Sequence, residues 1–88
     1  MKMTKNYILR DVGGRCVAVP VGRECQRFSG FIKLNDTAKL IWKSIEAGCT
    51  EEETIASLTA QYDVTPEHAR DAYRSTVEQL LSLGAVEQ

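Results

Sequence analysis

Few residues in this sequence are suited to enzyme chemistry. Its 88 residues include one histidine, His68, so a Cys–His or Ser–His–Asp arrangement has a single candidate base. His68 lies in the first turn of an expected helix, where a solvated side chain is the ordinary state. The glycines form neither G-x-x-x-x-G-K-S/T nor G-x-G-x-x-G, the two common phosphate-binding patterns. We therefore expect a protein that is not an enzyme.

Cysteine and long apolar runs are also scarce. Cys16, Cys25 and Cys49 are widely spaced and include no C-x-x-C pair, which favours three reduced thiols over a zinc site or a disulfide framework. No apolar stretch has the length of a membrane span, and the first residues, MKMTKNY, do not form a signal peptide. These absences predict a cytoplasmic protein that uses no membrane, no metal and no organic cofactor.

Charge is balanced overall but divided along the chain. The net charge is −1, yet residues 1–44 carry nine Lys and Arg against three acids, and residues 45–88 carry two Arg against nine acids. The basic half favours an anionic partner, although two halves that are simply solvated have the same pattern.

The N-terminal half has the alternation that is typical of β-strands. The segment YILRDV-GG-RCVAVPV places two strand-like runs around Gly13-Gly14, a pair that suits the positive φ angles of a two-residue hairpin turn. Residues 22–30 follow as a polar loop. A third short strand is expected over residues 31–34, with Ile32 and Leu34 pointing inward.

The C-terminal half predicts three helices with their own start and stop signals. Asn35 is a good N-cap for the first, and Gly48 ends it. A capping box at residues 50–53 opens the second, and Thr65-Pro66 opens the third, which Gly84 ends. The expected core stripe of the third helix comprises Ala69, Ala72, Thr76, Leu80 and Leu83, flanked by Tyr73, Val77 and Leu81. Together these elements predict one α+β domain over residues 1–88, winged-helix-like, with a three-stranded antiparallel sheet followed by three α-helices.

The predicted strand 31–34 is too short to stand alone, because its backbone donors and acceptors need a neighbour. One edge is expected to pair inside the chain. An open second edge is a hazard that proteins blunt with charge, and Lys33 suits that purpose. The same edge can receive a peptide that supplies the missing ladder, so two interpretations of Lys33 remain: a solubility device or part of a docking site.

The run GFIKLNDTAKLIW, followed by Gly48, TEEETIASLTAQYDV and LLSLGAV, resembles the PqqD family of small peptide chaperones, also called RiPP recognition elements. The pattern L-N-x-T-A-x-x-I-W is its most specific part, and the resemblance covers about residues 7–86. Residues 84–86 depart from the family pattern, since the family commonly has a larger aliphatic residue than Ala85 after the glycine at position 84. The resemblance implies a winged-helix-like domain that binds the leader segment of a ribosomally made precursor peptide. It also implies a partner, a modifying enzyme that is typically a radical SAM protein.

The resemblance further implies that the leader adds a strand to the third β-strand and lies against the third helix. The predicted peptide-binding residues are Phe28, Phe31, Ile32, Lys33, Leu34, Arg70, Tyr73, Arg74 and Val77. Tyr73 and Val77 are expected to line the groove, with Val77 as a core residue in the alternative. Arg70 and Arg74 are expected to meet leader carboxylates, or else to pair along the helix with Glu67 and Glu78.

A winged helix that binds DNA and regulates transcription is the competing hypothesis. Its third helix would enter the major groove. That helix carries Arg70 and Arg74 but also Glu67, Asp71 and Glu78, and acids repel phosphates. Nucleic acid is therefore disfavoured as a partner. The oligomeric state stays open, since the loop 22–30 is long enough to permit an exchange of strands between two copies.

Overall fold

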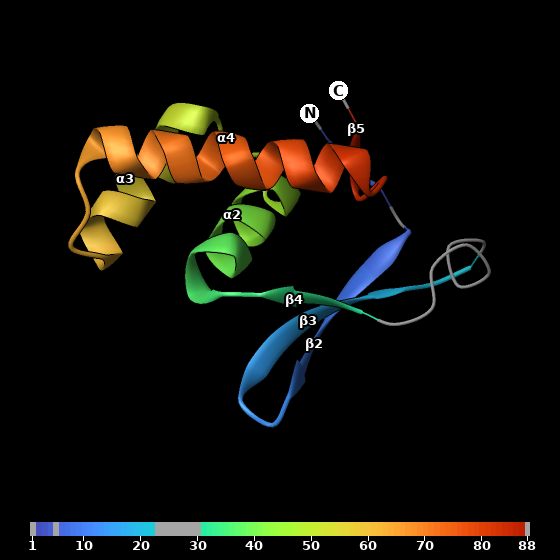
Figure 1. Cartoon of the computed structure of the whole chain (residues 1–88). Helices are drawn as coiled ribbons and strands as arrows, with labels where there is room; N and C mark the ends of the chain where they lie inside the picture. The colour runs from blue at the N-terminus through green and yellow to red at the C-terminus, as the bar shows by residue number, and fades with distance from the viewer. Residues whose placement is uncertain (1, 5, 23–30, 88) are drawn as a thin grey trace.

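In the described residues, three helices lie on one side of a small antiparallel sheet (Figure 1). The computed structural model describes residues 2–4, 6–22 and 31–87. The sheet has the order β2-β3-β4, formed by β2 (Tyr7–Val12), β3 (Arg15–Pro20) and β4 (Ile32–Leu34). The helices are α2 (Asp36–Glu46), α3 (Glu51–Gln61) and α4 (Pro66–Ser82). This arrangement confirms the predicted α+β, winged-helix-like fold.

The hairpin of β2 and β3 turns at the predicted glycine pair. Gly13 and Gly14 have φ angles of 59° and 81°, which a residue without a Cβ adopts at little cost. Leu9, Ala18 and Ile32 lie opposite one another across the three strands and face the helices. The strand β4 is one residue shorter than predicted, because Phe31 precedes this strand instead of belonging to it.

The strand β4 passes into α2 through a single residue, Asn35. Its side-chain oxygen Oδ1 accepts a hydrogen bond from the backbone N–H of Ala38 at 2.8 Å, which satisfies one of the free donors at the helix start. The direct connection fixes the first turn of α2, with Thr37 and Ala38, beside the end of β4. The capping box of Thr50 with Glu53 and the cap by Thr65 are likewise formed as predicted.

The core lies between the sheet and the helices. Ile41 and Trp42 are 0% and 1% exposed, as are Ala18 at 0% and Leu58 and Leu80 at 1% each. Ile41 and Trp42 are therefore core residues, as their position on the apolar stripe of α2 predicted. The indole N–H of Trp42 is buried and has no hydrogen-bond partner among the described residues.

The predicted core stripe of α4 is confirmed at Ala69 and Leu80 and wrong at Ala72 and Thr76. Ala69, Tyr73 and Leu80 are buried, whereas Ala72 and Thr76 are partly exposed. Tyr73 was expected only to flank the stripe, yet it is 4% exposed and belongs to the core. Burying a tyrosine ring removes far more apolar surface from water than burying an alanine or a threonine, so the helix turns its aromatic side inward.

A second sheet, absent from the sequence-based prediction, joins the two ends of the chain. Lys2–Met3 (β1) pairs antiparallel with Val86–Glu87 (β5). Thr4 donates its hydroxyl to the carbonyl of Gly84 at 2.7 Å, and Tyr7 donates its hydroxyl to the carbonyl of Leu83 at 2.9 Å. These bonds tie the start of β2 to the C-terminal end of α4.

We expect Tyr7→Phe to lower the free energy of unfolding by about 1 kcal/mol, because one partly buried hydrogen bond between α4 and β2 is lost. The midpoint of thermal unfolding, followed by circular dichroism, should fall by about 4–8 °C for a domain of this size. Ile8→Ala serves as a control, since this neighbouring side chain points to the other face of β2. An unchanged midpoint in Tyr7→Phe would show that the bond adds nothing to stability.

None of the helices in the described ranges combines the length and the apolar character that a membrane span requires.

Candidate functional site

The strand β4 lies at the edge of its sheet. Within the described part of the chain it pairs with β3 on one side only, through Ala18, Val17 and Cys16 opposite Ile32, Lys33 and Leu34. Alternate backbone N–H and C=O groups of an edge strand point away from the neighbouring strand. No other described strand lies at the second edge of β4, so none of the described residues blocks a further strand there.

A groove of about 300 Å³ runs between β4, the start of α2 and α4. The residues that line it are Ile32, Lys33, Leu34, Asn35, Thr37, Ala38, Ala72, Ser75, Thr76, Gln79 and Leu80. Ala38 and Ala72 leave room between the two helices because their side chains are small. Thr76 and Gln79 add polar groups to the α4 wall. The groove is thus lined by apolar and hydrogen-bonding groups together, and it lies directly beside the open edge.

The open space continues past the end of β4. A second hollow of about 390 Å³ shares Lys33, Leu34 and Asn35 with the groove and reaches Gly14 and Arg15 at the tip of the hairpin. Lys33 is exposed and lines both hollows. Lys33 and Arg15 contribute two cations to this hollow and Asp36 contributes one anion, so its net charge is positive and favours an acidic chain.

The structure separates the predicted peptide-binding residues into two groups. Ile32, Lys33 and Leu34 line the groove, and Phe31 lies exposed just before β4, while Phe28 falls outside the described residues. The four predicted residues of α4 do not line this groove. They lie on the opposite side of the helix, and three of them, Tyr73, Arg74 and Val77, line a different cavity.

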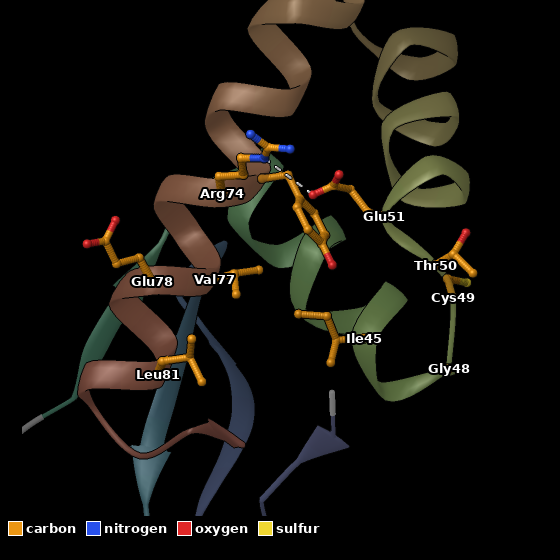
Figure 2. Close-up of a pocket in the computed structure, with 10 residues that line it drawn as sticks. Ile45, Gly48, Cys49, Thr50, Glu51, Arg74, Val77, Glu78 and Leu81 are labelled. Carbon is orange, nitrogen blue, oxygen red and sulfur yellow. Dashed lines mark ion pairs between the residues drawn. The ribbon is translucent and has the colours of Figure 1, made fainter. Parts of the chain in front are cut away.

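That second cavity, of about 800 Å³, lies between α4, the end of α2 and the start of α3. Figure 2 shows Val77 and Leu81 of α4 and Ile45 of α2 pointing into it, and Glu78 pointing away. Glu51 closes one end, where a carboxylate oxygen lies 3.6 Å from Nε of Arg74 (Figure 2). Burial, together with the nearby charge of Glu51, raises the pKa of the Tyr73 phenol above its usual value of 10.0.

Arg70 and Arg74 pair with α3 and not along their own helix. The guanidinium of Arg70 donates to Glu51 at 2.9 Å and to Glu52 at 3.2 Å. The alternative prediction, in which these arginines pair along the helix with Glu67 and Glu78, is therefore wrong. The acids Glu51 and Glu52 at the start of α3 therefore connect α3 to α4.

We expect Arg70→Ala to lower the free energy of unfolding by less than about 1 kcal/mol, since both ion pairs are partly exposed. The loss should shrink further in high salt, because screening weakens surface pairs in the unmodified protein. Thermal unfolding at two salt concentrations measures it, with Arg10→Ala on the sheet as a matched control. A loss of several kcal/mol would mean that this cluster is a main support of the fold.

Sequence reasoning missed the α4 wall of the groove. Ala72, Ser75, Thr76 and Gln79 form it, and Ala72 and Thr76 had been assigned to the core. The sequence does carry a signal for this wall. Small and polar residues recur at helical spacing, so that they share one side of α4, next to the side that contains Tyr73 and Leu80. Such a row cannot support a close-packed core, but it leaves space for another chain.

The described residues contain no metal-binding cluster. No group of three His, Cys, Asp or Glu side chains within them is arranged to hold a metal ion. His68 is exposed in the first turn of α4. The site consists of a strand edge, a groove and a few cations, and these are features of a binding surface.

Comparisons with known proteins agree with this geometry. The model of the family described as Coenzyme PQQ synthesis protein D (PqqD) matches residues 8–86. The solved structure of "TbiB1 in Complex with the TbiA(beta) Leader Peptide" has a TM-score of 0.80 at 18% identity and covers 99% of this chain and 95% of that chain. The structure of "Lasso peptide synthetase B1 complexed with the leader peptide" has a TM-score of 0.82 at 22% identity, with coverages of 99% and 96%. No curated protein sequence matches the chain.

Proposed function

Because this chain belongs to the PqqD family, we propose that it binds the leader segment of a ribosomally synthesised precursor peptide and presents that peptide to a modifying enzyme. The observation that carries the proposal is the open edge of β4 beside a groove walled by α4. The leader joins the sheet as a strand next to β4, so its backbone supplies affinity with little demand on sequence. Its alternate side chains enter the groove, where Ala38 and Ala72 leave room for apolar groups.

Two further observations support a leader as the ligand. The solved structures that share this fold over 99% of the chain are both complexes with leader peptides, as their names state. In the hollow next to the groove the cations Lys33 and Arg15 outnumber the anion Asp36, and this net positive charge favours an acidic peptide. The chaperone itself has no catalytic step in this scheme, and its part is to hold the peptide in an extended form.

For the modifying enzyme we propose the radical SAM class that the family resemblance implies. The alternative is an enzyme of a lasso peptide synthetase, the assembly named for one of the structural relatives. Purified candidates from each class, added to the protein with its leader bound, distinguish the two by ternary complex formation in size-exclusion chromatography. A complex with only the lasso-type enzyme rejects the radical SAM assignment.

The arrangement of α4 argues against the DNA-binding alternative. Arg70 is engaged with Glu51 and Glu52, and Arg74 with Glu51, so the cations of the would-be recognition helix are already paired. Phosphate contacts would have to displace these pairs and overcome nearby acids. We expect no sequence-specific footprint on duplex DNA at moderate salt, and such a footprint would overturn the peptide-binding proposal.

An NMR titration with a synthetic acidic leader, encoded beside this protein, tests the binding mode. Amide shifts are expected in residues 32–38 and not in residues 45–51, which border the second cavity. Lys33→Glu should weaken binding about tenfold at low salt and less at high salt, because it reverses a charge next to the docked strand.

Lys43→Glu is the matched control, since this exposed lysine of α2 lies outside the groove and its reversal changes the net charge equally. Equal weakening by both reversals would mean that only the overall charge matters. Shifts centred on residues 45–51 would place the peptide in the second cavity.

A further inference from the structure

The outward face of the sheet carries apolar side chains and cations together. Because Leu9, Ala18 and Ile32 face the helices, the residues next to them in each strand point the other way. The side chains that point away from the helices are Ile8, Arg10 and Val12 of β2, Arg15, Val17 and Val19 of β3, and Lys33 of β4. Val17 is only 5% exposed, so the accessible part of this face is formed mainly by the others. This set contains no acid. Figure 1 shows α2, α3 and α4 on the opposite side of the sheet, so none of the described helices covers this face.

Exposed apolar area gathers on this face. The large apolar residues that are most exposed in the described chain are Val12 at 61%, Phe31 at 53%, Ile8 at 40% and Val64 at 36%. Ile8 and Val12 point outward from β2, and Phe31 immediately precedes β4. A single exposed apolar residue is ordinary, but several on one face mark an interaction surface.

The proposed leader strand extends this same face. A strand added beside β4 becomes the fourth strand of the sheet, and its side chains alternate between the groove and the outward face. The outward leader side chains then lie next to Lys33. The exposed face becomes a composite of the chaperone and its peptide, and it exists in full only while the leader is bound.

The positive charges on this face favour some classes of binding partner over others. Arg10, Arg15 and Lys33 would repel the equivalent cations of a second copy stacked face to face. Nucleic acid would leave Ile8 and Val12 against a charged backbone, with their apolar surface unmatched. A protein surface with an apolar centre and an acidic rim matches both components.

We propose that this outward face docks the modifying enzyme through an apolar patch rimmed by acids, and that the enzyme contacts the bound leader and β2–β3 at once. The inference rests on the proposed function, because the leader strand is part of the surface. Leader and enzyme therefore bind cooperatively, and each raises the affinity for the other by the same factor.

The experiment uses the full-length protein, the purified modifying enzyme encoded beside it, and the synthetic leader. Calorimetry measures the affinity for the enzyme with and without the leader, and fluorescence anisotropy measures the affinity for the leader alone. Ile8→Asp and Arg10→Glu are each expected to weaken enzyme binding by at least about tenfold while leader affinity stays unchanged. Val64→Asp, which alters an equally apolar exposed residue away from the sheet, should change neither.

Each outcome bears on one of the two proposals. If neither Ile8→Asp nor Arg10→Glu weakens enzyme binding, the docking face is rejected while the leader groove stands. If the unmodified protein fails to bind leader, the proposed function is rejected before the face is tested. If Ile8→Asp unfolds the protein, the result for Arg10→Glu decides, because this substitution replaces one exposed charge by another. Dimers that Ile8→Asp disperses in sedimentation would assign the face to a second copy and overturn the proposal.

Discussion

Ala72→Phe should weaken leader binding by at least about tenfold, equivalent to about 1.4 kcal/mol, and leave the protein folded. Ala72 is partly exposed on the α4 wall of a groove of about 300 Å³. A phenyl ring at this position fills the space that a leader side chain needs. It does not overpack the core, since the buried side of the helix is formed by Ala69, Tyr73 and Leu80. Anisotropy with a labelled leader measures the loss, and the thermal midpoint verifies folding.

Val77→Phe is the control for this prediction. Val77 lies a little more than one turn further along α4 and lines the second cavity, whose volume of about 800 Å³ has room for the ring. Its substitution should leave leader affinity within about twofold. The opposite ranking, with Val77→Phe the more damaging of the two, would place the leader between α4 and α2 and restore the original assignment of Val77.

Tyr73→Ala is expected to destabilise the fold strongly. Tyr73 is 4% exposed, and removing a buried aromatic side chain costs about 3–5 kcal/mol. A domain of this size has a total stability of roughly 4–13 kcal/mol, so this loss takes a large part of it. Circular dichroism should show a midpoint lowered by well over about 10 °C. A variant that keeps its midpoint but loses leader binding would return Tyr73 to the peptide site.

Tyr73→Phe separates the ring from its hydroxyl. The ring keeps the packing, so most of the stability at neutral pH should remain. In the unmodified protein the raised pKa means that the folded state holds the phenolic proton more tightly than the unfolded state does. This contribution is present in full below pH 10 and is lost as the pH rises through the pKa of the folded state. Stability measured from pH 9 upward should therefore fall less steeply in Tyr73→Phe.

Local signals predicted the elements of this fold well. Gly13-Gly14 turns the hairpin, Asn35 begins α2, and the box at residues 50–53 begins α3, because each signal depends only on neighbours within a few residues. The β4 side of the candidate site was also predicted, since alternation identifies which residues of a short strand face the core. The edge follows from the same reasoning, because a strand with one partner has an open side.

The α4 side of the site was not predictable in the same way. The rotation of a helix about its axis depends on which of two adjoining stripes of side chains packs better against the core. In α4 the stripe that contains Tyr73 is buried, and Ala72 and Thr76 are left partly exposed. The partners of Arg70 lie 18 and 19 residues away on another helix, beyond the reach of an i to i+4 rule. The pairing of β1 with β5 spans nearly the whole chain, and two-residue strands carry no period to detect.

The pairing of Lys2–Met3 with Val86–Glu87 also makes this domain easy to graft. Adjacent antiparallel strands lie about 4.8 Å apart, so the two ends emerge side by side (Figure 1). A tether of a few residues would close the chain into a ring, and new ends opened at Gly13-Gly14 would yield a circular permutant with the same core. The domain can equally be spliced into a surface loop of another protein. The host would then carry a peptide-capturing module whose entry and exit points coincide and whose strand edge stays uncovered.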